Sequence, residues 1–218
     1  MSNFSGQELT RLLDRALFTA QASRGEIERL CSEARQHSFY GVAVNSSHVE
    51  LAAALLEDSD VNVIALIGFP LGSCDPDVKR FELETALDQG AQEFDFVLNH
   101  GRLKDGDHRY VLREMRDLAE AADERLVKVI LESSLLSREE IRTACELALD
   151  SGLQFISTAT DFHSPAITVD DVKYLRECVG ENFGVKAVGR ISDLTLAQAL
   201  LDAGADRLGI GMSLRGRD

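Results

Sequence analysis

The sequence predicts an α/β protein, with a single (β/α)8 TIM-barrel domain spanning residues 1–218. Three observations indicate this fold class. Short β-rich runs alternate with amphipathic segments along almost the whole chain. The runs contain few polar residues, as do the strands of a parallel sheet that helices cover on its outer face. With 218 residues, of which 44% are hydrophobic, the chain is long enough to bury one large core.

Eight runs are expected to form the strands of the barrel. They lie at residues 15–18, 40–46, 61–70, 93–99, 125–132, 154–160, 184–189 and 207–212. An open doubly wound sheet is the alternative, but it normally carries a G-x-G-x-x-G turn after its first strand, and the sequence has none there. A partial match, GIGMSLRG, follows the last run, where barrels often bind an anion.

Amphipathic segments between these runs predict the helices. Apolar residues recur at spacings of three and four in residues 24–39, 76–90, 137–152 and 192–206. Most of these segments have Gly at or near the end, as helix C-termini often do. The loop sequence IGFPLG is assigned to turn geometry, since Gly and Pro fix tight turns.

The composition excludes some classes of partner. A formal net charge of −14 and an isoelectric point near 4.8 argue against nucleic acid and anionic membrane surfaces, which attract Lys and Arg. The N-terminal residues do not resemble a targeting segment, and no run reaches the roughly 18 apolar residues of a membrane span. We therefore expect a cytoplasmic protein that acts on a small molecule. Its four cysteines lack metal-type spacing and are expected to be free thiols.

Several ionisable residues lie inside otherwise apolar strands: Asp95, Lys128 with Glu132 at the end of the same run, and Lys186. Alternate residues of a barrel strand face the interior, so these side chains should lie inside the barrel or at its mouth. They form either an ion network that only fills the barrel or an active site at the C-terminal mouth. Desolvation and a cationic neighbour lower the pKa of a lysine, and the free amine can form a Schiff base with a carbonyl.

Five stretches resemble the deoxyribose-phosphate aldolase family of (β/α)8 class I aldolases. They are VAVNSSHV, VIALIGFPLGS, EFDFVLNHGRLKDGD, VKVILESSLL and GVKAVGRI, in the order and spacing of the family. The resemblance extends from about residue 14 to about residue 214. It implies that Asp95 is the acid of a proton relay, Lys186 the second active-site lysine and Lys128 a lysine of the same pocket. Asp14 and Asn45 also match pocket positions.

The sixth strand departs from the family pattern. Where the family has V-K-T-S-T-G-F, with the imine-forming lysine, this chain reads ISTATDF at residues 156–162. Ser157 therefore stands in the lysine column, and it cannot form an imine. Asp161 stands in the column of a glycine that approaches the substrate phosphate, and a carboxylate there would repel a dianion.

Two further parts of the family's phosphate site have changed. Its S-G-G turn reads Val188, Gly189 and Arg190 here, and its final G-T-S-S is replaced by the segment 209–212, GIGM. The resemblance therefore implies an aldolase-like lyase whose substrate is not 2-deoxyribose 5-phosphate.

The first functional hypothesis is a lyase that carries out an aldol or retro-aldol reaction on a small carbonyl substrate. The imine would be relocated to Lys186 or Lys128, which lie on the strands beside the sixth, and Lys186 is the preferred nucleophile. Asp95 would be the general acid/base, and Lys128 would keep the pKa of Lys186 low. A competing effect is that Asp95 stabilises Lys186 as an unreactive ammonium.

The second hypothesis is a barrel enzyme that uses Asp95 and the two lysines for proton transfer alone, in a dehydration, isomerisation or cyclisation. His100 and His163 are further candidates for it. Other predicted substrate-binding residues are Ser157 and Thr160 as hydrogen-bonding groups and Arg190 as a clamp for a carboxylate, with Asp161 beside them. Alternatively, Arg190 and Asp161 form an ion pair that seals the vacated phosphate site.

The third hypothesis is a non-catalytic pseudoenzyme, against which the intact acid and lysines argue. No cofactor and no metal are expected, because a lysine imine supplies the electron sink that zinc supplies in class II aldolases and the chain lacks a convincing His cluster. Family analogy suggests a homodimer or larger homo-oligomer. Glu132 is assigned to orienting a lysine or a loop.

Overall fold

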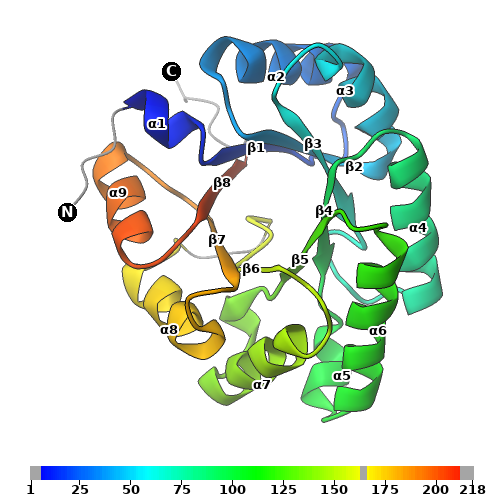
Figure 1. Cartoon of the computed structure of the whole chain (residues 1–218), viewed down its shortest axis with the longest axis vertical. Coiled ribbons are helices and arrows are strands. Elements are labelled where there is room, and N and C mark those ends of the chain that lie inside the picture. Colours follow the sequence, from blue (N-terminus) through cyan, green and yellow to red (C-terminus); the bar gives the residue numbers. More distant parts are fainter. Residues whose placement is uncertain (1–5, 163–165, 212–218) are drawn as a thin grey trace.

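A computed structural model describes residues 6–162 and 166–211, which form a closed barrel of eight parallel strands surrounded by helices (Figure 1). The strands are β1 (Leu13–Leu17), β2 (Gly41–Asn45), β3 (Asn62–Ile67), β4 (Glu93–Val97), β5 (Leu126–Ile130), β6 (Phe155–Ser157), β7 (Gly184–Val188) and β8 (Arg207–Gly211). Strands adjacent in sequence pair with each other, and β1 pairs with β8 to close the ring. The predicted (β/α)8 barrel is confirmed.

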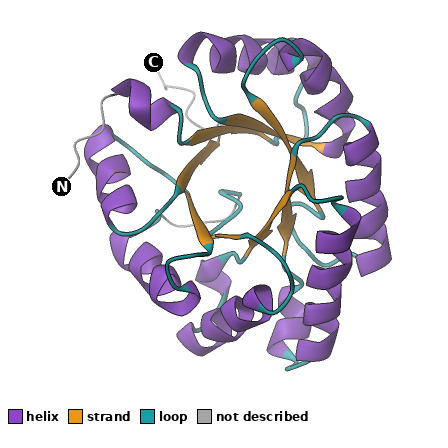
Figure 2. Ribbon diagram, in the orientation of Figure 1, coloured by secondary structure: helices purple, strands orange, loops and turns teal. Residues whose placement is uncertain are grey.

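The helices form the outer layer (Figure 2). They are α1 (Gly6–Thr10), α2 (Arg24–His37), α3 (Val49–Leu56), α4 (Pro76–Asp88), α5 (His100–Lys104), α6 (His108–Ala121), α7 (Arg138–Leu149), α8 (Val169–Val179) and α9 (Leu194–Asp202). Two short 3-10 helices, η1 (Ser46–His48) and η2 (Ser133–Leu135), follow β2 and β5. The four segments predicted from their periodicity correspond to α2, α4, α7 and α9.

Local signals in the sequence explain where these helices begin. Helix α4 starts with Pro76 just after Asp75, whose side chain accepts a hydrogen bond from the backbone N–H of Asp77 at 3.0 Å. Helix α7 starts with a capping box, in which Ser137 and Glu140 bond each other's backbone N–H groups. These starts fix the lengths of the loops at the mouth of the barrel.

The barrel interior has an apolar side and an ionic side. On the apolar side, Ala43, Ile64 and Leu66 pack together, with Phe18 and Phe69 against them at the mouth. The ionic side takes its charged residues from β1, β4, β5, β7 and β8, whose inward-facing side chains form a continuous set of ion pairs. On each strand only every second residue faces this interior, because strand side chains alternate between the two faces of the sheet.

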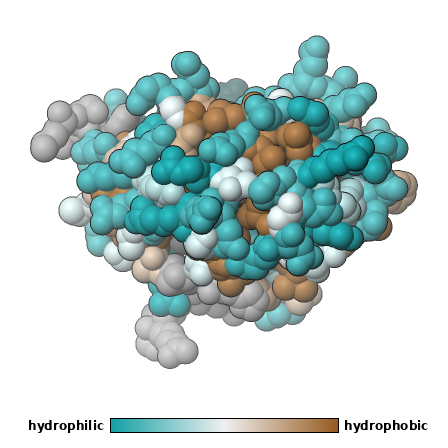
Figure 3. All heavy atoms as spheres, turned by 90° about the horizontal axis from the view of Figure 1, so that it is seen from below, coloured by the Kyte–Doolittle hydropathy of each residue, from teal (hydrophilic) through white to brown (hydrophobic). Residues whose placement is uncertain are grey.

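One face of the molecule is mainly polar (Figure 3). Figure 3 views the molecule from below the orientation of Figure 1, and hydrophilic side chains predominate on this face, with hydrophobic ones scattered between them. This agrees with a sequence in which 28% of the residues are charged. Among the helices of the described ranges, none is long and apolar enough to cross a membrane.

The loop after β3 confirms that IGFPLG owes its composition to turn geometry. Gly68 and Gly72 have positive φ angles, 59° and 68°, which favour glycine. The side chain of Glu82 on α4 accepts a hydrogen bond from the backbone N–H of Gly68 at 2.8 Å. The loop therefore lies tightly against the helix that follows it.

Replacing Gly72 with alanine is expected to lower the free energy of unfolding by roughly 2–4 kcal/mol, because the new Cβ adds a clash to the strain of a positive φ. A Cβ at this position would overlap the carbonyl oxygen of Leu98 and lie 2.9 Å from a methyl carbon of Val97. Urea unfolding followed by circular dichroism measures the loss.

The matched control is Gly106→Ala. Gly106 has φ 71°, yet a Cβ there would meet nothing within 4 Å. Only the backbone strain remains, so the expected loss is about 1 kcal/mol. Equal losses in the two variants would show that the loop has room to shift and that the packing at Gly72 is not a constraint.

Candidate active site

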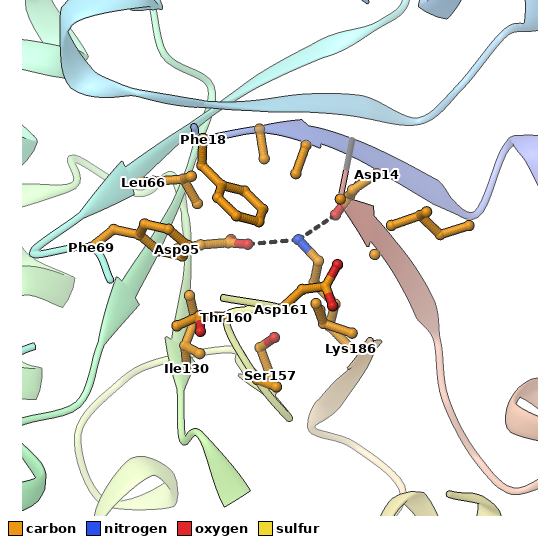
Figure 4. Close-up of a pocket in the computed structure, with 17 residues that line it drawn as sticks. Asp14, Phe18, Leu66, Phe69, Asp95, Ile130, Ser157, Thr160, Asp161 and Lys186 are labelled. Atoms are coloured by element: carbon orange, nitrogen blue, oxygen red, sulfur yellow. Dashed lines mark hydrogen bonds and ion pairs between the residues drawn. The ribbon is translucent and has the colours of Figure 1, made fainter. Parts of the chain in front are cut away.

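A pocket lies inside the barrel toward the C-terminal ends of the strands. Its polar lining residues are Asp14, Asp95, Ser157, Thr160, Asp161 and Lys186 (Figure 4). All six were predicted as site residues. The structure therefore brings together side chains from four separate parts of the sequence at the position where barrel enzymes have their active sites.

Lys186, on β7, is held between two carboxylates. Its Nζ donates a hydrogen bond to Asp95 Oδ2 at 2.6 Å and lies 2.7 Å from Asp14 Oδ2 (Figure 4). Burial favours the neutral amine, but the charges of Asp14 and Asp95 outweigh it and raise the pKa of Lys186. At neutral pH the side chain is therefore an ammonium ion.

This result corrects one prediction. Lys128 was expected to keep the pKa of Lys186 low, and that is wrong, because the groups in contact with Lys186 Nζ are carboxylates rather than a cation. The competing effect, in which Asp95 stabilises Lys186 as an ammonium, agrees with the structure. Any chemistry at this amine must begin with the loss of its proton.

Asp95, on β4, bridges the two lysines. Burial opposes the ionised form, but the ammonium groups of Lys128 and Lys186 outweigh this effect and lower the pKa of Asp95 well below its usual range. Its carboxylate is therefore charged at neutral pH. In this state Asp95 can accept a proton, which is the starting condition for a general base.

Lys128, on β5, lies below the pocket and is not among its lining residues. The side chain is fully buried, and Nζ donates to Glu93 Oε2 at 2.6 Å and to Asp95 Oδ1 at 2.8 Å. It therefore holds Asp95 from beneath. Of the two candidate nucleophiles, Lys186 reaches the pocket and Lys128 does not.

Ser157, at the end of β6, offers an unused polar group to the pocket. Its Cα is the register partner of Lys186 on β7, so the two side chains are neighbours at the same level of the barrel. Its Oγ is buried and has no hydrogen-bond partner among the described residues. A buried unsatisfied hydroxyl is costly in a folded protein, and a ligand in the pocket would satisfy it.

The loop after β6 is held by Glu132. The backbone N–H of Thr160 donates to Glu132 Oε2 at 3.0 Å, and the hydroxyl of Thr160 donates to the same oxygen. The Thr160 hydroxyl also accepts a hydrogen bond from the N–H of Phe162 at 3.1 Å. The loop-orienting role predicted for Glu132 is confirmed. The expected hydrogen bond from Thr160 to a substrate stays a prediction, because the loop itself uses this hydroxyl.

Asp161 lies at the mouth, in a backbone conformation with φ 60°. Its carboxylate accepts a hydrogen bond from the backbone N–H of Gly211, while burial, the largest influence, raises its pKa. Arg190 is exposed and acts on Asp161 only as a nearby positive charge. Within the described residues the two side chains do not form an ion pair that would seal the mouth, although the positive charge of Arg190 lowers the pKa of Asp161 in opposition to burial.

Comparison with known proteins identifies the family. No profile of a protein family matches the chain. It is, however, 48% identical over 202 residues to the deoxyribose-phosphate aldolase of Exiguobacterium sibiricum, a match that covers 92% of this chain and 91% of that relative. It is 45% identical over 202 residues to the same enzyme of Bdellovibrio bacteriovorus, with 93% and 92% covered. The chain belongs to the deoxyribose-phosphate aldolase family.

Solved structures agree with this assignment. The aldolase QR15 superposes with a TM-score of 0.89 at 33% identity, covering 93% of this chain and 91% of that one. The tetrameric deoxyribose phosphate aldolase of Aeropyrum pernix gives a TM-score of 0.87 at 27% identity, with 94% and 87% covered. The family resemblance is therefore confirmed, and with it the class, a lyase of the class I aldolase type. The homo-oligomer expected for this chain stays a prediction.

Not all the residues carried over from the deoxyribose-phosphate aldolase family lie in the pocket. Asn45 ends β2, and its amide donates to the backbone oxygen of Phe18 at 3.3 Å. It is not among the described lining residues.

The Nε2 atom of His100 lies 2.8 Å from the backbone oxygen of Leu131, and burial lowers the pKa of His100. His100, a candidate only for the proton-transfer hypothesis, therefore has Nε2 occupied by the backbone and does not favour proton transfer to a substrate. His163 lies outside the described residues.

Sequence reasoning missed the lower part of the ionic side. Glu93 and Arg207 are buried, and both belong to the same network as Asp95. Glu93 was detectable, since it lies two residues before Asp95 and the two must share a strand face. No comparable signal pointed to Arg207 at the start of β8. Within the described residues, no cluster of three or more His, Cys, Asp or Glu side chains is arranged to hold a metal ion.

Proposed function

We propose that this protein is an aldolase-type lyase that makes or breaks a carbon–carbon bond in a small carbonyl compound, with its imine relocated to Lys186. The observation that carries the proposal is the position of Lys186 Nζ in the pocket, in direct contact with Asp95 and Asp14. Among the described residues that line the pocket, it is the one side chain that can form an imine.

The first step transfers a proton from the Lys186 ammonium to Asp95, and the neutral amine then adds to the carbonyl carbon. The resulting carbinolamine loses water as Asp95 returns the proton, which leaves an iminium ion. The ammonium and the iminium are both cations, so Asp14 and Asp95 stabilise the start and the end of this sequence alike. They oppose only the short-lived neutral amine, which makes the step slow rather than unfavourable overall.

Carbon–carbon cleavage then follows from the same groups. Asp95, again a carboxylate, removes the proton of a hydroxyl group two carbons from the iminium carbon, and the electrons of the breaking bond move into the iminium. Hydrolysis of the enamine releases the second product and restores Lys186. In this scheme Asp95 is the general acid/base and Lys128 holds it in place from below.

The substrate is expected to lack a phosphate group. Asp161 places a carboxylate on the N–H of Gly211 at the mouth, where it repels an anionic group in the substrate. The free hydroxyl of Ser157 matches a neutral hydroxyl or carbonyl instead. We therefore propose a short, uncharged hydroxy-aldehyde or hydroxy-ketone rather than 2-deoxyribose 5-phosphate.

A second function is favoured by the raised pKa of Lys186. As an ammonium, Lys186 can donate a hydrogen bond to a substrate carbonyl oxygen and stabilise an enolate, while Asp95 moves the proton on carbon. Such an enzyme would isomerise or dehydrate its substrate without an imine. A non-catalytic barrel is the remaining possibility, and it predicts neither an adduct nor proton exchange.

Borohydride trapping separates these functions. The protein is incubated with acetaldehyde, glycolaldehyde, glyceraldehyde or dihydroxyacetone, reduced, and weighed by mass spectrometry. The proposal predicts an adduct that Lys186→Met abolishes and Lys104→Met, at an exposed lysine, retains. Exchange of substrate carbon protons with deuterium in the absence of an adduct would establish the second function, and the absence of both would contradict catalysis.

The rate of trapping should rise with pH. Since the pKa of Lys186 is raised, the ammonium predominates at neutral pH and each pH unit increases the free amine up to about tenfold. We expect the rate of adduct formation at Lys186 to be still increasing at pH 9. The rate is measured as the fraction of protein that carries the reduced adduct at short times. A rate that stops increasing near pH 7 would indicate a lysine with a lowered pKa.

A further inference from the structure

We propose that Glu93 and Arg207 are positioning residues of this site, which set how firmly Lys186 is held between Asp14 and Asp95, although neither lines the pocket. The importance of these two residues for catalysis rests on the proposed function, but the experiment that tests their positioning role does not. Both residues lie at the N-terminal end of the barrel, as the first residues of β4 and β8.

The structural basis is a closed ring of alternating charges inside the barrel. Going around it, the contacts join Lys186 to Asp95 at 2.6 Å, Asp95 to Lys128 at 2.8 Å and Lys128 to Glu93 at 2.6 Å. The ring continues from Glu93 to Arg207 at 3.3 Å, from Arg207 to Asp14 at 2.5 Å and from Asp14 back to Lys186 at 2.7 Å. We call these six residues the ionic ring. Three cations and three carboxylates give it zero net charge.

The carboxylates divide their oxygens between the pocket and the deeper cations. Asp14 directs Oδ2 to Lys186 and Oδ1 to Arg207, and Asp95 directs Oδ2 to Lys186 and Oδ1 to Lys128. Each carboxylate therefore presents a single oxygen to Lys186, because a deeper cation occupies the other. Glu93 in turn holds both deeper cations through one oxygen, Oε2. Loss of the Glu93 charge therefore affects Lys186 along two routes, one through Lys128 and Asp95 and the other through Arg207 and Asp14.

Tyr40 anchors the lower end of the ionic ring. Its hydroxyl donates to Glu93 Oε1 at 2.8 Å, and the guanidinium carbon of Arg207 lies 3.1 Å from the centre of its ring. Tyr40 also faces a cavity at the opposite end of the barrel from the pocket, together with Arg11 and Asp60. The contacts of Tyr40 keep Glu93 and Arg207 in fixed positions without adding a charge.

The charge balance gives the direction of each effect. Removing the charge of Glu93 leaves three cations and two carboxylates in a buried site, so the ring then favours the neutral form of Lys186. Removing the charge of Arg207 leaves two cations and three carboxylates and favours the ammonium. The other groups that face Lys186 are Ser157 on β6, which is uncharged, and Asp161 above it, and neither variant changes them.

The test is a pH titration of the lysine side-chain nitrogens by NMR in the whole protein, with Lys186 assigned by its loss in Lys186→Met. The sequence has only five lysines, which keeps the spectrum simple. In Glu93→Gln we expect Lys186 to lose its proton roughly one pH unit or more below the wild type. In Arg207→Gln it should remain an ammonium to a higher pH than in the wild type.

Two controls separate charge from packing. Glu114→Gln removes a carboxylate that is equally buried, in a pair with Lys79 at 2.7 Å between α4 and α6, and it should leave the Lys186 titration unchanged. Tyr40→Phe keeps all six charges and should leave the midpoint close to the wild-type value. If Glu93→Gln does not fold, the upward shift in Arg207→Gln tests the same claim.

An unchanged Lys186 titration in the folded charge variants, or an equal shift in Glu114→Gln, would overturn the inference. Because the readout is the lysine nitrogen itself, the result does not depend on whether Lys186 forms an imine. Opposite shifts with no trapped adduct would support the ionic ring and reject the proposed imine. A trapped adduct without the shifts would support the proposed imine and reject the positioning role of Glu93 and Arg207.

Discussion

Replacing Ser157 with lysine is expected to create an imine-forming amine in the pocket. The new side chain would start beside Lys186, since the two Cα positions are register partners on β6 and β7. The neighbouring ammonium lowers the pKa of the new lysine by about 1–3 units, which increases its free amine at neutral pH by roughly 10- to 1,000-fold. Borohydride trapping with glyceraldehyde, followed by peptide mass spectrometry, should place the adduct on residue 157.

Lys104, which is partly exposed, is the internal reference for this experiment. Residue 157 should be modified at least about tenfold faster than Lys104, because only the lysine at residue 157 has the ammonium of Lys186 beside it to favour its free amine. Adding Asp161→Gly should extend the reaction to glyceraldehyde 3-phosphate, since glycine suits the φ of 60° and the repelling carboxylate is gone. Equal modification of residue 157 and Lys104 would show that the pocket does not activate an amine.

Replacing Asp95 with asparagine is expected to lower the free energy of unfolding by about 3–5 kcal/mol, the usual cost of leaving buried charges without a partner. Asp95 is in contact with both Lys128 and Lys186 and is almost fully buried. The ionic ring would then carry a net positive charge in the barrel interior. Urea unfolding monitored by circular dichroism gives the free energy.

The matched control is Asp117→Asn on helix α6. Asp117 pairs with Arg113 at 3.2 Å on the surface, where an ion pair contributes no more than about 1 kcal/mol. A loss below about 1 kcal/mol in Asp95→Asn would mean that the charges of the ring are solvated or rearranged, and the ring could not then transmit the effects proposed for it.

The fold was predictable because strand and helix periods differ and the order of runs is regular. The first and last residues of the strands were harder to predict. The first strand was predicted at residues 15–18 but is Leu13–Leu17, because Asp14 faces the ionic interior and does not look like a strand residue. The sixth was predicted at residues 154–160 but is only Phe155–Ser157. Beyond it, the backbone N–H of Val188 on β7 donates to the hydroxyl of Thr158 instead of a backbone oxygen, and the backbone N–H of Thr160 donates to Glu132.

The site was predictable in its residue types and less so in its electrostatics. Charged residues inside apolar strands identified Asp95, Lys128 and Lys186, and strand alternation placed them inside the barrel. The direction of the pKa shift of Lys186 depended on which atoms surround Nζ, and that information requires side-chain positions on three separate strands. The same holds for Arg207, whose role depends on contacts with β1 and β4 that no local pattern reveals.

The central claim is that Lys186 is the amine that reacts with the substrate. Its most direct test is to locate a borohydride-reduced adduct in the wild-type protein by tryptic digestion and tandem mass spectrometry. Reduction at Lys186 should block cleavage there and give the peptide of residues 177–190 with the added mass. An adduct confined to Lys104, Lys173 or the N-terminus, or none at all, would contradict the claim.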